Sequence, residues 1–214
     1  MMKCLVWTWF TVVVLCIAGA TAAAHSAATP AAHSDRQPMS LSFMGRRYFL
    51  YHTEKKGIGV STMYSPSRTH PGTARESLVI NWTLSHSAGH SVVTAHQVAD
   101  TMYLTFRAMH APWEFHFAVP NRHSPGHFVY FVSALLLLPA QRETELIMAR
   151  VRAPSGGKWI VDASYIRAHP GHWSGDTKMR KVLAPDMSWL KQHMQAVAGA
   201  LTKLRAPLSP PHPG

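Results

Sequence analysis

Cysteine is almost absent from this chain of 214 residues, and its only two cysteines, Cys4 and Cys16, lie near the start. Both fall within residues 1–24, which have the plan of a secretory signal peptide: an early positive charge, an apolar run and then small residues. We expect cleavage after Ala22 or Ala24. The exported protein would then contain no cysteine, which excludes disulfides, thiol nucleophiles and cysteine-based metal sites.

An uncleaved membrane anchor is the alternative, because the apolar run approaches the roughly 17 to 25 residues that span a bilayer. The alanine-rich exit and the low-complexity segment behind it favour cleavage. We therefore expect an exported protein, periplasmic or secreted, that can be held at a membrane through a partner. Residues 25–40 predict a flexible leader, 41–205 a single domain, and 206–214, with four prolines in nine residues, a loose tail.

Acidic residues are scarce: there are 10, against 21 lysines and arginines, which gives a net charge of +11. A basic surplus raises the question of nucleic acid. Export, the lack of zinc-finger spacing and the lack of an aromatic RNA-binding signature or a long basic run all argue against it. We expect the counterpart to be an acidic protein partner or an anionic membrane surface. The alternative is a solvated basic surface that only keeps the protein soluble.

Catalytic signatures are also missing. The sequence has no Gly-x-Ser-x-Gly elbow, no Walker loop, no Gly-x-Gly-x-x-Gly and no His-Glu-x-x-His. Glu114 and Asp162 fall in predicted strands, and neither has a second carboxylate at a spacing diagnostic of acid–base chemistry. Nothing in the sequence gives positive support to an enzyme.

The apolar residues change along the chain between a period of two and a period of 3.6. Alternation, short apolar runs and a Pro-Ser-Gly-Gly turn together predict strands at Phe43 with 48–51, 58–64, 78–84, 113–119, 128–138, 146–152 and 158–167. Helical spacing predicts one helix over 91–109, capped by Ser91, and another over 186–204. The almost wholly apolar stretch 128–138 is too short for a membrane helix and predicts a central strand buried on both faces.

These elements predict an α+β fold with a mainly antiparallel sheet of about six or seven strands and two packed helices. The order of strands, helix, strands and helix resembles that of the Mog1/PsbP-like domains. This resemblance rests on element order in the folded part. It implies a sandwich architecture and a small exported or adaptor protein without catalysis.

Histidine is the one plentiful chemical resource. His86 and His90 flank the entrance to the first helix, His96 falls on its apolar face, and Glu114 and His116 point the same way from the following strand. If that strand pairs beside the helix entrance, these side chains can converge on zinc or copper. The alternative is that His96 is a hydrogen-bonded core histidine and the others are exposed polar residues.

Two further histidine pairs are candidates for the same chemistry. His123 and His127 flank a Ser-Pro-Gly turn, and His169 and His172 lie in one predicted loop. None of these spacings is specific, because a pair of histidines separated by a few residues indicates a metal only within one helical face or one tight turn.

The leading hypothesis is therefore an exported, non-catalytic accessory or adaptor subunit that binds another protein in a periplasmic or membrane-associated complex, such as an oxidoreductase or a secretion assembly. A histidine-based metal or small-ligand binding protein is the second hypothesis, and a hydrolase the third. The candidate contact residues are basic or large and apolar: Lys178, Arg180, Lys181, Trp173 and Trp189, with Met109 and Trp113 if exposed.

Overall fold

The computed structural model describes residues 39–71, 74–87, 90–91, 93–121, 127–138, 142–154, 157–170, 179–205 and 210. The expected signal peptide, nearly all of the expected leader and most of the expected tail lie outside these residues. No helix in the described part of the chain is long and apolar enough to cross a membrane.

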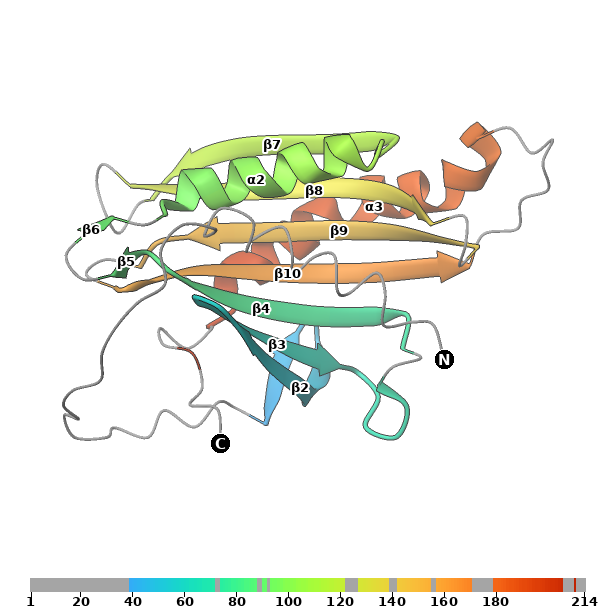
Figure 1. Cartoon of the computed structure of the whole chain (residues 1–214). Helices are drawn as coiled ribbons and strands as arrows, with labels where there is room; N and C mark the ends of the chain where they lie inside the picture. Colours follow the sequence, from blue (N-terminus) through green and yellow to red (C-terminus); the bar gives the residue numbers. More distant parts are fainter. Residues whose placement is uncertain are drawn as a thin grey trace.

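An eight-stranded antiparallel sheet forms the body of the protein (Figure 1). Its strands are β1 Ser40–Phe43, β2 Arg46–Lys56, β3 Gly59–Ser65, β4 Glu76–Leu84, β7 Trp113–Pro120, β8 Phe128–Leu138, β9 Glu143–Arg152 and β10 Trp159–Pro170. Two short strands, β5 His86–Ser87 and β6 His90–Ser91, pair only with each other. The α+β class is confirmed, and the expected six or seven strands were slightly too few.

The extra strand arises from a tight turn in the first predicted strand. Met44 and Gly45 both have positive φ, 48° and 76°, which is the backbone of a two-residue hairpin turn. This turn separates β1 from β2, so the segment expected as one strand folds back on itself. Glycine adopts this conformation without steric cost, whereas Met44 gave no signal for it in the sequence.

The order across the sheet is β1-β2-β3-β4-β10-β9-β8-β7. The expectation that 128–138 is the central strand was wrong, because β8 lies second from the edge. Only its second half, from Val132 onward, is largely buried, and its first residues are exposed or half-buried. The centre of the sheet is instead the pair β4 and β10.

Helix α2, Ala95–Ala108, starts later than expected. Its N-cap is Thr94, whose side chain accepts a hydrogen bond from the backbone of Gln97, while the Gln97 side chain accepts one from the backbone N–H of Thr94. This reciprocal capping box fixes the first turn, so Ser91 does not cap the helix. Ser91 lies in β6 instead.

Helix α3, Met179–Lys203, starts well before the expected Asp186 and continues through Pro185. Asp186 is fully buried and holds this end of the helix against the sheet. Its carboxylate accepts a hydrogen bond from Thr144 of β9 and pairs with Arg167 of β10 at 3.1 Å. These polar contacts stabilise the helix around Pro185, so it begins before the expected start at Asp186.

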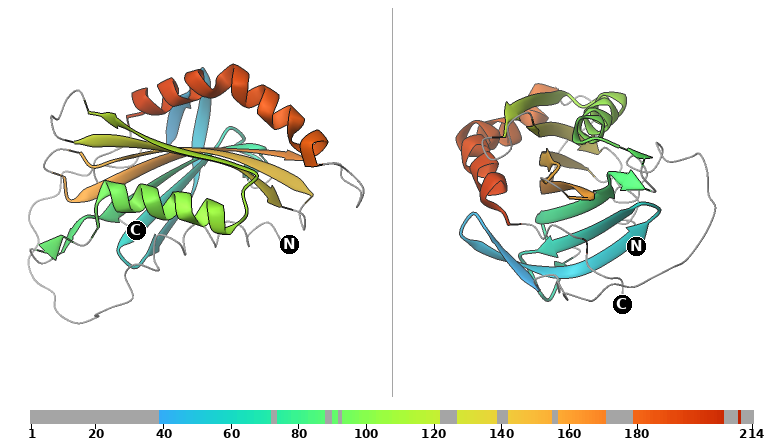
Figure 2. Two further views of the ribbon diagram at one scale, coloured as in Figure 1. Left: turned by 90° about the horizontal axis from the view of Figure 1, so that it is seen from above. Right: turned by 90° about the vertical axis from the view of Figure 1, so that its left-hand side faces the viewer.

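The two helices cover opposite faces of the sheet (Figure 2). Helix α2 packs on β7, β8 and β9 through Val98, Ala99, Met102 and Phe106. Helix α3 packs on β9 and β10 on the other face, and its buried residues there include Leu190, Val197 and Leu201. Each face therefore has its own hydrophobic core.

Two carboxylates of the sheet, the buried Asp162 and the half-buried Glu145, have raised pKa values. Asp162 accepts hydrogen bonds from Asn81 at 2.6 Å and Ser164 at 2.7 Å, yet burial raises its pKa to about 6. Burial, with a smaller contribution from the charge of Glu143, raises the pKa of Glu145 to about 7. Both shifts disfavour the charged form, so both groups destabilise the folded chain when ionised.

Replacing Thr94 by alanine should lower the free energy of unfolding by about 1 kcal/mol, because the capping box loses its acceptor. Thr101 of the same helix donates only to the Gln97 carbonyl, which already accepts within the helix. Thr101→Ala is therefore the matched control and should change stability by no more than about 0.5 kcal/mol. Urea unfolding of the two variants measures both effects, and equal losses would show that the cap does not stabilise α2.

Glu145→Gln should make the protein less dependent on pH. The folded-state pKa of Glu145 is raised from 4.5 to about 7, so the wild type loses stability as pH rises through this window. The variant should match the wild type near pH 4.5 and exceed it by an amount on the order of 2 kcal/mol at pH 8. Glu143→Gln should reproduce only a small part of this gain, since burial is the larger cause. A stability difference between Glu145→Gln and wild type that stays constant from pH 4.5 to 8 contradicts the assignment.

Candidate functional site

Strand β7 lies at one edge of the sheet and pairs only with β8 among the described strands (Figure 1). The pairing runs without a register shift from Trp113 opposite Leu135 to Pro120 opposite Phe128. Successive side chains of a strand point to opposite faces, so β7 presents two different surfaces. Glu114 and His116 face α2, and the aromatic residues face the side of the sheet that carries α3.

The side of β7 that faces α2 forms a polar cluster with that helix. Nε2 of His96 lies 3.3 Å from Oδ2 of Asp100, and Nδ1 of His116 lies 3.7 Å from Oδ1 of the same carboxylate. The ring of Tyr130 lies against both imidazoles, at centroid distances of 5.4 and 6.1 Å. Asp100 therefore connects the helix to the edge strand.

This geometry revises the expected metal cluster. The structure brings His96 and His116 to one carboxylate, but Glu114 turns to Arg107, with 3.6 Å between Oε1 and Nε. The placement of His96 on the apolar face was wrong, because 60% of its side chain is exposed.

The remaining histidines of that prediction, His86 and His90, lie in β5 and β6, and their side chains are outside the described part of the structure. Within the described part, no group of three or more His, Cys, Asp or Glu side chains is arranged to hold a metal ion. A zinc or copper site that uses His86 or His90 stays a prediction.

The other histidine pairs are only half described. His127 is exposed just before β8, while His123 lies outside the described residues. His169 lies near the end of β10, where its backbone carbonyl accepts a weak hydrogen bond of 3.4 Å from Thr144, and His172 lies outside the described residues. The structure therefore does not test either pair.

The opposite side of β7 carries a row of apolar side chains that continues onto β8. We call this row the aromatic face and define it by six residues: Trp113, Phe115, Phe117 and Val119 of β7 with Val129 and Phe131 of β8. Ring contacts run along it, from Trp113 to Phe115 at 6.1 Å, on to Phe117 at 4.8 Å and across to Phe131 at 5.0 Å. Phe117 and Val119 are 37% and 39% exposed.

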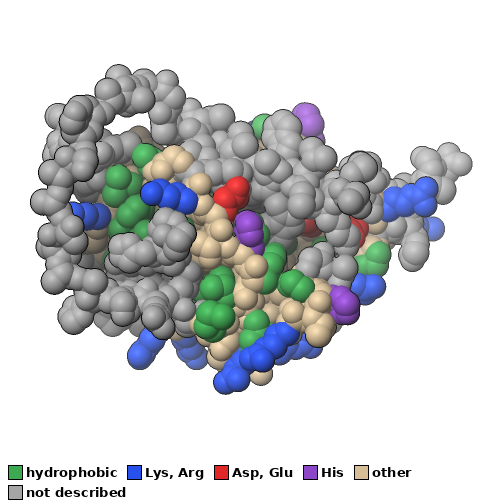
Figure 3. Space-filling model, turned by 60° about the horizontal axis from the view of Figure 1, so that its bottom comes forward, with side chains coloured by type: hydrophobic (Ala, Val, Ile, Leu, Met, Phe, Trp, Pro, Cys, Tyr) green, Lys and Arg blue, Asp and Glu red, His purple; other side chains and the backbone are tan. Residues whose placement is uncertain are grey.

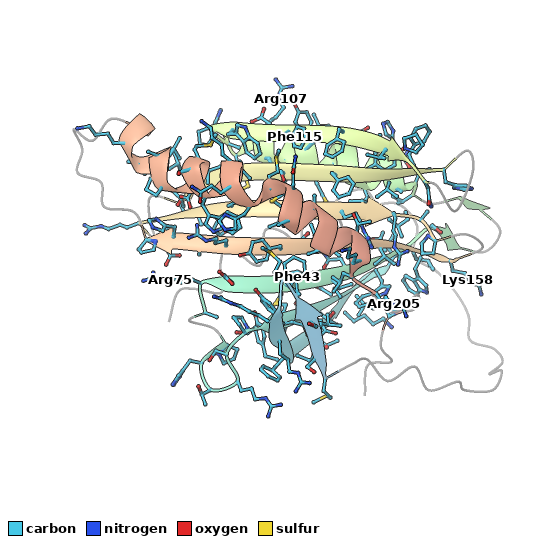
Figure 4. The ribbon with its side chains drawn as sticks, turned by 180° about the vertical axis from the view of Figure 1, so that it is seen from behind. Phe43, Arg75, Arg107, Phe115, Lys158 and Arg205 are labelled. Atoms are coloured by element: carbon cyan, nitrogen blue, oxygen red, sulfur yellow. The ribbon has the colours of Figure 1, made fainter. Side chains whose placement is uncertain are left out.

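The aromatic face is open because α3 does not reach it. The helix lies on β9 and β10, and Phe115 lies beyond it, on the β7 side of the sheet (Figure 4). Trp113 is half-buried against the core beneath α3, and exposure increases towards Val119. The part of Phe117 and Val119 that stays in water gains no free energy from burial when the chain folds.

Two arginines of β9 border the aromatic face. Arg150 lies opposite Phe131 and Arg152 opposite Val129. Nη1 of Arg150 donates a hydrogen bond of 2.6 Å to the carbonyl of Thr202 at the end of α3. The Nε atoms of both arginines are buried and find no hydrogen-bond partner among the described residues.

Burial lowers the pKa of both arginines, and with the neighbouring charge of Arg152 it brings the pKa of Arg150 to about 10. Both remain cations near neutral pH. Positive charge thus lies beside the aromatic face, although Arg150 is only 4% exposed.

The expected contact residues on and around α3 do not belong to the aromatic face. Trp189 is half-buried: its ring stacks on Tyr165 at 6.0 Å and on His193 at 4.4 Å, and Cζ of Arg167 lies 4.7 Å from its centre. Lys181 is exposed on the first turns of the helix.

The structure says less about the other expected contact residues. The side chain of Arg180 and all of Lys178 and Trp173 lie outside the described part. Met109 is 36% exposed after α2, and Trp113 belongs to the aromatic face.

Comparison with known proteins gives no relatives from which a role could be transferred: the chain matches no family model and no curated protein. The function must therefore be argued from the surface itself.

Sequence reasoning found the alternation in β7 but not the residues that complete the two surfaces. Asp100 follows His96 by one helical turn, and this i,i+4 spacing was the available signal for the polar cluster. Arg150 and Arg152 were visible as basic residues at alternate positions of a strand. Their position beside Phe131 and Val129 depends on the pairing of β8 with β9, which no local pattern shows.

The aromatic face should bind the hydrophobic dye 8-anilinonaphthalene-1-sulfonate in the folded protein. Phe117→Ser should reduce the dye fluorescence by about half or more, because it removes the most exposed ring of the row. Leu104→Ser is the matched control: Leu104 is 60% exposed on α2, far from this row, and its loss should leave the fluorescence unchanged. Leu104→Ser should stay within about 1 kcal/mol of wild-type stability, and Phe117→Ser should lose about 1 to 2 kcal/mol with its ring contacts but remain folded. Equal dye binding by all three proteins would show that the face is not accessible.

Proposed function

We propose that this protein is an exported, non-catalytic accessory subunit that binds another protein through the aromatic face. The observation that carries the proposal is the exposure of Phe117 and Val119 on an edge strand that has no partner on its outer side among the described strands. The partner belongs to a periplasmic or membrane-associated complex.

A contiguous apolar surface of this kind is typical of an interface. Aromatic residues are enriched at the centres of protein–protein interfaces and often contribute most of the binding free energy. Scattered exposed apolar residues need no explanation, but Phe115, Phe117 and Phe131 touch one another in a row. Their burial by a partner would recover the free energy that folding leaves unused.

The charge of the protein favours an acidic partner. The chain carries a net charge of +11, and Figure 3 shows Lys and Arg side chains at several places on the face turned forward there, with few acidic ones. Arg150 and Arg152 place part of this charge directly beside the aromatic face. Opposite charge on the partner would speed the encounter and orient it.

The order of elements supports the same proposal. Strands, a helix, strands and a second helix follow one another as in the Mog1/PsbP-like domains, and we propose that the finer architecture is also of this sandwich type. Small adaptor proteins without catalysis are common among such domains. This analogy concerns the fold, whereas the aromatic face supplies the argument for binding.

Gentle native extraction from the host tests the proposal, with tagged wild type, Phe117→Ser and Leu104→Ser compared by sizing and mass spectrometry. We expect one acidic protein in fixed stoichiometry with the wild type and with Leu104→Ser. Phe117→Ser should lose at least about nine-tenths of it, since a central aromatic residue of an interface contributes 2 kcal/mol or more. The proposal would be contradicted if all three proteins were recovered without a partner, or if all three carried the same partner in the same yield.

A further inference from the structure

We infer that the partner binds by adding a β-strand to the free edge of β7, and that this strand comes from a protein of net negative charge and carries apolar residues at alternate positions. The inference rests on the proposed function and names how the partner is held. Edge strands offer a row of N–H and C=O groups that a further strand can pair with, and alternate side chains then provide specificity.

β7 has few of the features by which proteins usually protect an edge strand: its one charged residue, Glu114, faces α2 and pairs with Arg107. It is eight residues long, whereas the other edge strand, β1, has four. Its sequence contains no lysine or arginine, and its ladder with β8 has no bulge, in contrast to the shift between Leu50 and His52 in β2 and β3. Its only proline, Pro120, is the last residue. An edge that is long, regular and apolar on one side is a template for pairing.

The aromatic face explains why the added strand needs apolar residues. Phe117 stacks on Phe131 across the β7–β8 ladder, with 11° between the ring planes. A further strand would lie about 4.8 Å from β7, which places its side chains about 5 Å from Phe115 and Phe117. Apolar side chains at every second position would extend the row, while the positions between them would lie beside Glu114 and His116.

Charge distinguishes a foreign partner from a second copy of this chain. Pairing of two β7 strands would bring together two chains that each carry +11. A partner of net negative charge meets attraction in place of this repulsion.

Site-specific photo-crosslinking in the host tests the inference. The photoreactive residue p-benzoylphenylalanine replaces Phe117 in one variant and Leu104 of α2 in the control, and mass spectrometry maps the crosslinked partner residue. We expect a crosslink from position 117, but not from 104, to a segment with alternating apolar residues in an acidic protein. A synthetic peptide of the mapped segment should then bind the purified protein.

Proline variants separate strand addition from other forms of docking. Of two neighbouring residues in an antiparallel edge strand, one directs its N–H to the paired strand and the other directs it outward. We therefore compare Ala118→Pro with Val119→Pro. The variant that keeps wild-type stability is the one at the residue whose N–H points outward. This variant should weaken binding of the mapped peptide by about tenfold or more, because the new ladder loses a hydrogen-bond donor and meets a proline ring. Serine at the same position keeps the N–H and is the matched control.

The outcomes distinguish the two proposals. A peptide that binds the stable proline variant as well as the serine variant overturns strand addition but leaves protein binding intact, as does a crosslink to a partner helix. A crosslink from position 117 to a second copy of this chain overturns the acidic partner and shows that β7 forms a homodimer interface. No crosslink from either position, together with a lone protein on native extraction, overturns the proposed function as well.

Discussion

The pairing of β10 with β4 holds the two halves of the molecule together. Strands β1 to β4 pair in chain order, and so do β7 to β10, so each half is an antiparallel meander that forms from local contacts. Only the ladder from Trp159 opposite Leu84 to Arg167 opposite Glu76 joins them into one sheet. Trp82 and Ile160, buried on opposite faces of this junction, belong to the two separate cores.

This junction also decides which surface stays open. Because the second meander joins the first through its last strand, its first strand, β7, is left at the edge. Helix α3 follows β10 in the chain and returns over β10 and β9, where Asp186, Thr144 and Arg167 fix its start. The helix therefore does not cover β7 and β8. The aromatic face is a consequence of topology together with a sequence that places phenylalanine where a soluble edge strand would carry polar residues.

Local patterns predicted much of this fold. The bounds of β8 were predicted as they are found, because its apolar run follows a segment that contains Pro, Gly and His and is ended by Pro139 and polar residues. The start of α2 was wrong although Thr94 and Gln97 carry the capping-box pattern, since Ser91 offered an earlier cap. The position of β8 was wrong because strand order depends on the pairing of β4 with β10, residues far apart in the sequence. For the same reason the alternation of β7 was predictable, but the openness of its aromatic side was not.

We propose above all that β7 binds another protein. Hydrogen–deuterium exchange tests it most directly, with the protein studied both alone and as extracted with its partner. The account predicts that exchange slows over 113–120 in the complex, while β1, at the other edge of the same sheet, keeps its rate. Unchanged exchange over 113–120 in a stable complex would contradict it and place the interface elsewhere on the molecule.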